Sequence, residues 1–272
     1  MPTLSLPEVT LAYEEAGQTG PAVLLVQGTG CLGQGWRPQI DDLCRDHRVI
    51  WFDNRGIGGS QPLQGGVRVE HMADDCWRLL DHLRIERAHI VGHSLGGMIV
   101  QEAARRQPKR VASLSLLSTA YRGRDVAVPG LANLRASLGM LFGSERSRWL
   151  AAASLCFPPA FRATLSDEEK LRHVHLIFTP DFLGQPPIVR QQIAALWHHR
   201  GGDMTKLRDL HTLIVSGRQD IVVPTRLSRQ LHQLLPQARF EIFDGAGHGV
   251  PLQLPGPINQ LLRQHFAAAT PR

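Results

Sequence analysis

Hydrophobic and polar positions follow two periods along this chain, and together they predict strands that alternate with helices. Short apolar runs, as expected of strands buried on both faces, span 22–27, 48–52, 88–91, 111–118, 212–216 and 239–243, and a weaker alternation at 4–14 indicates an edge strand. Apolar residues recur at helical spacing over 36–46, 70–83, 95–106, 226–235 and 257–268. This order predicts an α/β fold with a mostly parallel, doubly wound sheet.

The alternation stops between residues 120 and 206, where helical patterns dominate and no comparable strand occurs. We therefore expect a helical cap at 120–206, inserted into a core made of 1–119 and 207–272. The large aromatic side chains of this segment suggest an enclosed apolar pocket between cap and core; they are Phe142, Trp149, Phe157, Phe161, Phe178, Phe182 and Trp197. Arg122 and Arg124, where the chain enters the cap, are candidates to hold a carboxylate, although solvated surface charges are the favoured interpretation.

Composition narrows the class of protein. The 272 residues are 43% hydrophobic and 20% charged, which is ordinary for a globular enzyme, and the net charge of +6 comes from scattered basic residues that do not indicate nucleic-acid binding. The four cysteines lack metal-ligand spacing, and neither a secretory signal nor a membrane-spanning apolar run is present. We expect a cytoplasmic protein that binds a small molecule, not nucleic acid or membrane. Its oligomeric state stays open, with a homodimer as one alternative.

Candidate chemistry centres on Gly92-His93-Ser94-Leu95-Gly96-Gly97, which lies between an apolar strand and a helix. A serine in a tight strand-to-helix turn, with glycines two residues before and after it, is typical of a nucleophile elbow. The turn exposes the Ser94 hydroxyl, and the helix N-terminus offers the Leu95 N–H to a developing oxyanion. The alternative is a glycine-rich turn whose serine merely caps the helix.

A second small-residue turn, Gly28-Thr29-Gly30, follows the predicted strand at 22–27. Ligands of open parallel sheets bind beyond the carboxyl ends of the strands, so this turn and Ser94 are expected to face one cleft. The N–H of Thr29 or of Gly30, which the sequence does not separate, would complete an oxyanion hole with Leu95. A plain turn without a role in binding is the alternative.

An acid and a base follow later strands. Asp220 lies a few residues beyond the strand at 212–216, and His248 lies in the glycine-rich loop Gly245-Ala246-Gly247-His248-Gly249. A carboxylate at Asp220 can orient the His248 imidazole, although acidic residues also favour helix starts. Asp244 and Asp125 are the competing acids. Asp220 is preferred because Asp244, only four residues before His248, would have to fold back sharply to reach its ring.

The order Ser94, Asp220, His248 resembles the catalytic triad of the α/β-hydrolase superfamily, and this resemblance implies a sheet of eight strands with an inserted helical cap. The resemblance covers nearly the whole chain, is weak only in the cap, and includes the loop Asp53-Asn54-Arg55-Gly56-Ile57-Gly58-Gly59-Ser60. Ser118-Thr119-Ala120 and the elbow are similar to the branch of enol-lactone hydrolases, cofactor-free haloperoxidases and small carboxylesterases. One departure is Gln27-Gly28, where the family usually has His-Gly before its oxyanion loop.

The resemblance implies hydrolysis of small to medium carboxylic esters or lactones through an acyl-enzyme on Ser94. Hydrolysis of C–C bonds in ring-cleavage products, and cofactor-free haloperoxidase or perhydrolase activity, use the same residue types and remain alternatives. A non-catalytic ligand-binding protein of the same fold is disfavoured by the intact Ser, Asp and His. No metal and no organic cofactor is expected, because the sequence has neither a metal-binding motif nor a dinucleotide fingerprint.

Overall fold

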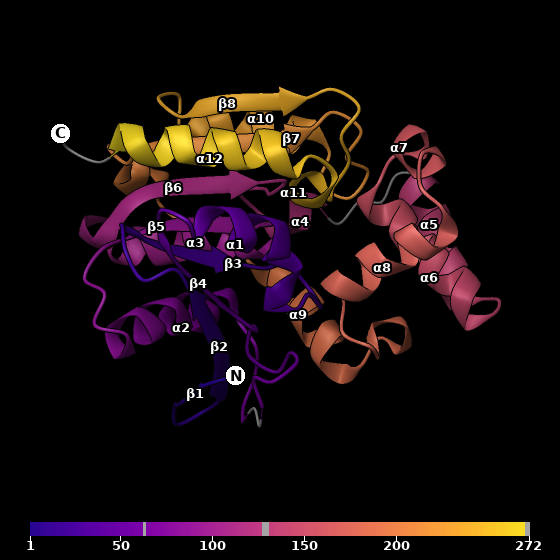
Figure 1. Ribbon diagram of the computed structural model, residues 1–272, viewed down its shortest axis with the longest axis horizontal. Helices are drawn as coiled ribbons and strands as arrows, with labels where there is room; N and C mark the ends of the chain where they lie inside the picture. Colours follow the sequence, from indigo (N-terminus) through magenta and orange to yellow (C-terminus); the bar gives the residue numbers. More distant parts are fainter. Residues whose placement is uncertain (62–63, 127–130, 270–272) are drawn as a thin grey trace.

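The computed structural model describes residues 1–61, 64–126 and 131–269, and a sheet of eight strands lies at its centre (Figure 1). The strand order is β1-β2-β4-β3-β5-β6-β7-β8. The strands are β1 (Thr3–Ser5), β2 (Thr10–Ala16), β3 (Ala22–Val26), β4 (Arg48–Phe52), β5 (Ala88–His93), β6 (Val111–Leu117), β7 (Thr212–Gly217) and β8 (Arg239–Phe243). The β1–β2 and β2–β4 pairs are antiparallel and the others are parallel, which confirms the predicted fold class.

Helices cover both faces of this sheet because consecutive strand residues point to opposite sides. In β3, Val23 and Leu25 pack toward α1 (Arg37–Leu43) and α12 (Pro255–Ala269). Leu24 and Val26 belong to the core on the other face, which is covered by α2 (Val69–His82), α3 (Leu95–Arg106) and α10 (Thr225–Leu234). The continuous apolar runs of the sequence therefore correspond to strands buried on both sides.

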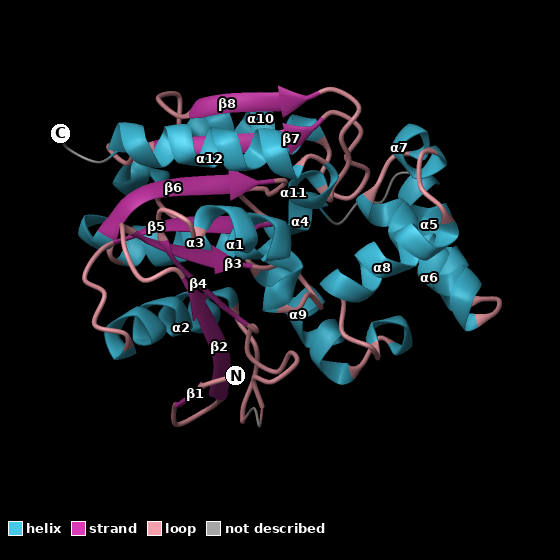
Figure 2. Ribbon diagram, viewed as in Figure 1, coloured by secondary structure: helices cyan, strands magenta, loops and turns pink. Residues whose placement is uncertain are grey.

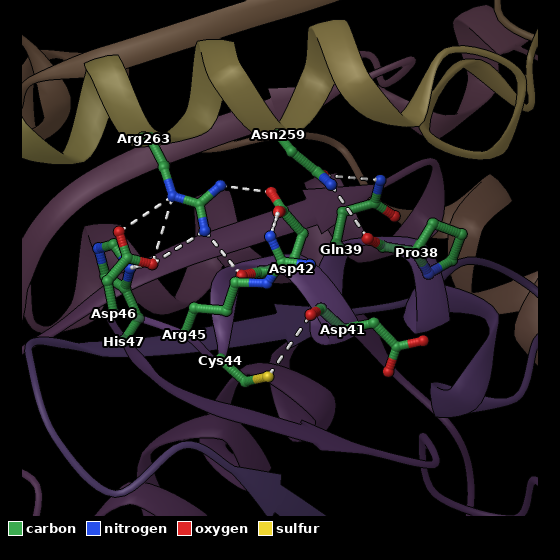
Figure 3. A network of polar contacts seen from close by, with 10 residues as sticks. All are labelled: Pro38, Gln39, Asp41, Asp42, Cys44, Arg45, Asp46, His47, Asn259 and Arg263. Carbon is green, nitrogen blue, oxygen red and sulfur yellow. Dashed lines mark hydrogen bonds and ion pairs between the residues drawn. The ribbon is translucent and has the colours of Figure 1, made fainter.

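A polar network joins α1 to α12 on the outside of the first face (Figure 3). The Arg263 guanidinium donates to the carboxylates of Asp42 and Asp46. Asn259 Nδ2 donates to the Pro38 carbonyl at 3.0 Å. The bond to Arg263 lowers the pKa of the Asp46 carboxyl, so this carboxylate stays charged at neutral pH. The network links two helices that are more than 200 residues apart in the sequence.

Helices fill the connection between β6 and β7, and they lie beyond the ends of the parallel strands (Figures 1 and 2). They are α4 (Gly123–Val126), α5 (Leu131–Leu141), α6 (Glu145–Cys156), α7 (Pro159–Ala163), α8 (Asp167–Ile177) and α9 (Pro187–His198). Ser166 and Glu169 form a reciprocal capping box that fixes the start of α8. A separate cluster of buried apolar residues, which includes Trp149 and Phe157, forms the core of this cap.

Local details differ from the sequence prediction. The stretch at 4–14 forms two strands of a hairpin, β1 and β2, and a short helix, α11 (Val250–Gln253), precedes α12. A 3-10 turn at Gly33–Trp36 leads into α1, which has Pro38 in its first turn, begins one residue later than expected and ends at Leu43, three residues earlier than expected. No helix in the described ranges is both long and apolar enough to cross a membrane.

Candidate active site

Ser94 occupies the tight turn between β5 and α3, with φ 55° and ψ −122°. The residues two positions before and after Ser94 must be glycine, because a Cβ at Gly92 would lie 2.3 Å from the Gly96 carbonyl oxygen. A Cβ at Gly96 would lie 2.2 Å from the carbonyl oxygen of Val26 in β3. The Ser94 N–H donates to the Leu117 carbonyl at 3.0 Å, and Thr119 Oγ1 donates to the Ser94 carbonyl at 2.7 Å. The turn is thus fixed by its backbone, while the serine side chain faces a cavity.

The Gly28-Thr29-Gly30 turn lies directly beside Ser94, since a Cβ at Gly28 would be 3.0 Å from the Ser94 Cβ. The structure separates the two candidate donors of this turn. The Gly30 N–H donates to Oε1 of Gln192, on helix α9, at 2.8 Å. The N–H groups of Thr29 and Leu95 have no acceptor within the part of the chain that the structure describes. Thr29 and Leu95 are therefore the free donors, and Gly30 is not.

Gln27, the residue at which the sequence departs from the His-Gly pair expected from the resemblance, supports the same turn. Its Oε1 accepts the Gly28 N–H at 3.2 Å, and its own carbonyl accepts Asn54 Nδ2 at 2.8 Å. The glutamine therefore hydrogen-bonds the turn that follows it. Asn54 belongs to the loop after β4, where Asp53 accepts the Gly33 and Gly59 N–H groups and Arg55 forms a buried bidentate pair with Asp75.

Asp220 and His248 meet across the ends of β7 and β8. His248 Nδ1 lies 2.9 Å from Asp220 Oδ2, and both residues are buried. The other carboxylate oxygen accepts the N–H groups of Val222 and Val223 at 2.9 and 2.7 Å, so the carboxylate is held in one orientation. Because a carboxylate accepts from Nδ1–H, Nε2 is the ring nitrogen left to exchange a proton.

The competing acids lie elsewhere. Asp244 forms an ion pair with Arg218, and its side chain is 80% exposed. Asp125 lies on α4, with Arg124 as its nearest cation at 3.9 Å. Neither contacts His248, so the preference for Asp220 agrees with the observed hydrogen bond.

The His93 side chain packs against the loop that carries His248. Its Nε2 donates to the His248 carbonyl at 2.8 Å, and the two ring centroids are 4.8 Å apart. Burial, together with the neighbouring His248, lowers the pKa of His93 to about 3. His93 is therefore neutral at neutral pH and adds no positive charge that would oppose a protonated His248.

Ser94 and His248 line one cavity of about 360 Å³ between the sheet and the cap. Its wall includes Thr29, Gln27 and many apolar side chains of the cap, among them Met140, Leu155, Ile177, Phe178, Phe182 and Leu183. No lysine, arginine, aspartate or glutamate of the described residues lines it. A cavity of this composition suits an uncharged, largely apolar ligand.

The large aromatic side chains of the cap segment divide between the cavity and the interior of the cap. Phe178, Phe182 and Trp197 line the cavity. Trp149 and Phe157 pack inside the cap itself, Phe161 packs against that cluster, and Phe142 is exposed. Arg122 lies over the Tyr121 ring, 5.1 Å from its centroid, and Arg124 is on the surface. Neither arginine reaches the cavity, so neither holds a substrate carboxylate there.

Sequence reasoning missed Gln192, which is completely buried and 162 positions from its partner Gly30. A glutamine within an amphipathic helix carries no local signal of such a contact. Sequence reasoning also assigned no role to His93, although the position of this histidine directly before Ser94 is a signal that could have identified it.

The eight-stranded sheet and the serine, aspartate and histidine at its edge are typical of α/β hydrolases, and comparison with known proteins gives the same class. The chain belongs to the α/β-hydrolase family, since residues 21–253 match the family model described as alpha/beta hydrolase fold. Over 267 residues the chain is 31% identical to an Agrobacterium fabrum protein named "Putative carbamate hydrolase RutD", a match that covers 94% of this chain and 98% of that protein.

Solved structures of the same fold cover almost the whole chain. A thermophilic esterase from Thermogutta terrifontis matches with a TM-score of 0.73 and 28% identity, over 98% of this chain and 97% of that one. The enol-lactonase of Burkholderia xenovorans LB400 matches with a TM-score of 0.80 over 98% of this chain and all of that one (100%), and at 20% identity it is evidence for the fold alone.

Proposed function

We propose that this protein hydrolyses uncharged carboxylic esters or lactones of small to medium size, through an acyl-enzyme on Ser94. The observation that carries the proposal is the placement of Ser94, Thr29 with its free N–H, and the Asp220-bound imidazole of His248 at one cavity, with the free Leu95 N–H directly after Ser94 in the chain. Each is a group that acyl transfer requires, and their geometry is fixed by contacts of the surrounding backbone.

In the proposed mechanism, Ser94 Oγ attacks the substrate carbonyl while His248 Nε2 takes its proton. The Thr29 and Leu95 N–H groups stabilise the oxyanion, and each such donor is typically worth about 3 kcal/mol of the barrier. His248 then donates the proton to the leaving alcohol. A water molecule, deprotonated by His248, next attacks the acyl-enzyme and releases Ser94. Asp220 keeps Nδ1 protonated and stabilises the imidazolium throughout.

The lining of the cavity favours neutral substrates. A carboxylate inside it would lose hydration without gaining a cationic partner among the described residues. The name of the Agrobacterium fabrum relative points to carbamates. A neutral carbamate ester would present its carbonyl to Ser94 as a carboxylic ester does, whereas a carbamate anion would meet no counter-charge there.

The test is reaction with a fluorophosphonate probe followed by a substrate panel. Wild-type protein is expected to be labelled at Ser94, and Ser94→Ala is expected to lose labelling and nearly all turnover with an unchanged melting temperature. The panel comprises p-nitrophenyl esters of increasing acyl length, simple lactones, a p-nitrophenyl carbamate, and a p-nitrophenyl hemisuccinate matched in length to a neutral ester. Turnover by Ser94→Ala within tenfold of wild type would contradict the proposal.

The panel also tests the substrate class. We expect kcat/KM to peak at short or medium acyl chains, and to be about a hundredfold lower for the hemisuccinate than for its neutral counterpart, since an unpaired buried charge costs several kcal/mol. A peak at long chains, or a preference for the hemisuccinate, would show that the cavity does not select substrates in this way.

A further inference from the structure

The turn that carries the free Thr29 N–H is held by the cap as well as by the core. Leu32 N–H donates to the carbonyl of Ile177, at the end of α8, at 2.7 Å, and Thr179 N–H donates to the Gly30 carbonyl at 3.3 Å. Cys31 and Phe178 form an isolated antiparallel bridge between the same two segments. The third contact comes from Gln192, whose Oε1 accepts the Gly30 N–H.

Contacts on both sides fix the peptide group between Thr29 and Gly30. Its carbonyl, that of Thr29, accepts Cys31 Sγ–H at 3.3 Å, and its N–H, that of Gly30, is bound by Gln192. Gly30 has φ +67°, and a Cβ there would lie 2.7 Å from the Phe182 ring, so the turn is confined from the cap side too. The free Thr29 N–H belongs to the adjoining Gly28–Thr29 peptide group, whose carbonyl accepts the Cys31 N–H at 3.3 Å, so the Gly30–Gln192 bond acts on it through the Thr29 Cα that the two peptide groups share.

Packing alone does not explain a glutamine at position 192. The side chain is completely buried, and its Nε2 has no hydrogen-bond partner in the described part of the chain. Burying an amide with its N–H groups unused is unfavourable, and an apolar side chain of similar size would avoid that cost. Val189 and Ala195, buried on the same helix, are apolar. What glutamine adds is the acceptor for Gly30.

We propose that Gln192 is a positioning residue for the oxyanion hole, through which cap helix α9 sets the orientation of the Thr29 N–H. This inference rests on the acyl-transfer function proposed above. Since the oxyanion develops only in the transition state, loss of the Gln192 acceptor is expected to lower kcat and leave KM nearly unchanged. A residue that merely stabilised the cap would change the melting temperature or the binding of every ligand instead.

The test compares Gln192→Met with Gln191→Met, a matched control at the exposed neighbouring position of α9. Methionine keeps the length of the side chain and removes the acceptor. Active sites are first titrated to completion with a fluorophosphonate, so that kcat is counted per folded, reactive molecule even when part of a preparation is unfolded. Steady-state kinetics on a neutral ester then gives kcat and KM, and inhibition by a trifluoromethyl ketone, which forms the oxyanion adduct, is compared with inhibition by the matching unreactive alcohol.

Gln192→Met is expected to lower kcat by 10- to 100-fold, somewhat less than the roughly 10²–10³-fold loss from deleting a donor. Inhibition by the trifluoromethyl ketone should weaken by a similar factor, while KM and inhibition by the alcohol should stay within about threefold of wild type. Gln191→Met should behave as wild type in all of these measurements. An unchanged kcat, or equal weakening of both inhibitors, would overturn the inference while leaving acyl transfer intact. Wild-type protein that is neither labelled nor active would refute the proposed function and this inference together.

Discussion

At the scale of single residues, Ser94 combines a strained backbone with an essential hydroxyl. Its φ of 55° with ψ −122° belongs to a region that glycine adopts freely and other residues adopt at a cost of about 1–3 kcal/mol. Strain of this kind persists when the surroundings fix the chain, and here Gly92, Gly96 and the bonds to Leu117 and Thr119 do so. The fold therefore maintains an unfavourable conformation at the residue proposed as nucleophile.

This strain gives a stability prediction that is independent of activity. Ser94→Gly and Ser94→Ala should both be inactive, but glycine relieves the backbone strain and alanine retains it. We expect Ser94→Gly to exceed Ser94→Ala by about 1 kcal/mol in the free energy of unfolding, because glycine lacks the Cβ that opposes left-handed conformations. Urea unfolding of the two variants measures the difference, and a more stable alanine variant would show that the turn is not strained.

Asp220 gives the second prediction at this scale. Asp220→Asn preserves shape, but its amide N–H₂ favours the wrong tautomer of His248, so the rate should fall by about 10⁴-fold. Asp244→Asn is the matched control, since Asp244 is exposed and paired with Arg218. Its kcat/KM on a neutral ester should stay within about twofold of wild type. An equal loss in both variants would remove Asp220 from the proposed mechanism.

At the scale of elements, the junction of β5 and α3 depends on close backbone approach. Gly96→Ala would push a methyl group to 2.2 Å from the Val26 carbonyl, and that backbone lies in the central strand β3. We expect a loss of about 2–3 kcal/mol or more in the free energy of unfolding, as overpacking of a rigid site typically causes. Gly256→Ala in α12, where nothing lies within 4 Å of the added Cβ, should be neutral or slightly stabilising. Chemical denaturation checks both, and equal effects would contradict this account.

The elements that could be predicted from the sequence are those with a local signal. Apolar runs locate the strands, and Gly92, Ser94 and Gly96 identify the elbow, because the close approach at this turn requires glycine at fixed spacing. The positions of Asp220 and His248 follow from a general rule, that loops at the carboxyl ends of parallel strands face one cleft. Local pattern and general topology thus suffice for the core of the fold and for most of the candidate site.

Contacts between distant segments could not be predicted in this way. Helical periodicity in the cap shows which residues are apolar, but not whether Trp149 packs within the cap or Phe182 faces the cavity. The bond from Gly30 to Gln192 depends on how α9 packs over the core, and without it Thr29 and Gly30 are equivalent candidates. Tertiary packing decides these points, so the structure is needed to assign the donor.

At the scale of the whole molecule, buried histidines occur both at the site and away from it, between β5 and α12. His93 lies beneath His248, while His89 contacts Ser113 at 2.8 Å and His265 stacks on His211 with centroids 4.3 Å apart. Burial lowers the pKa of His89 to about 4 and the pKa values of His93 and His265 to about 3. In the unfolded chain, each of these imidazoles takes up a proton near pH 6.5.

This difference makes the fold sensitive to mild acid. Between about pH 6.5 and 4 the unfolded chain binds protons that the folded protein does not, so the free energy of unfolding falls as the pH falls. From pH 7 to pH 5, each of the three histidines His89, His93 and His265 should remove roughly 2 kcal/mol from the free energy of unfolding. His265→Phe keeps a ring against His211 and removes the titrating group, so it should reduce the total drop by about that amount. His71→Phe, at an exposed position, should leave the drop unchanged. Urea unfolding at pH 7, 6 and 5 measures all three proteins, and a His265→Phe curve parallel to wild type would show that this histidine does not carry the acid sensitivity.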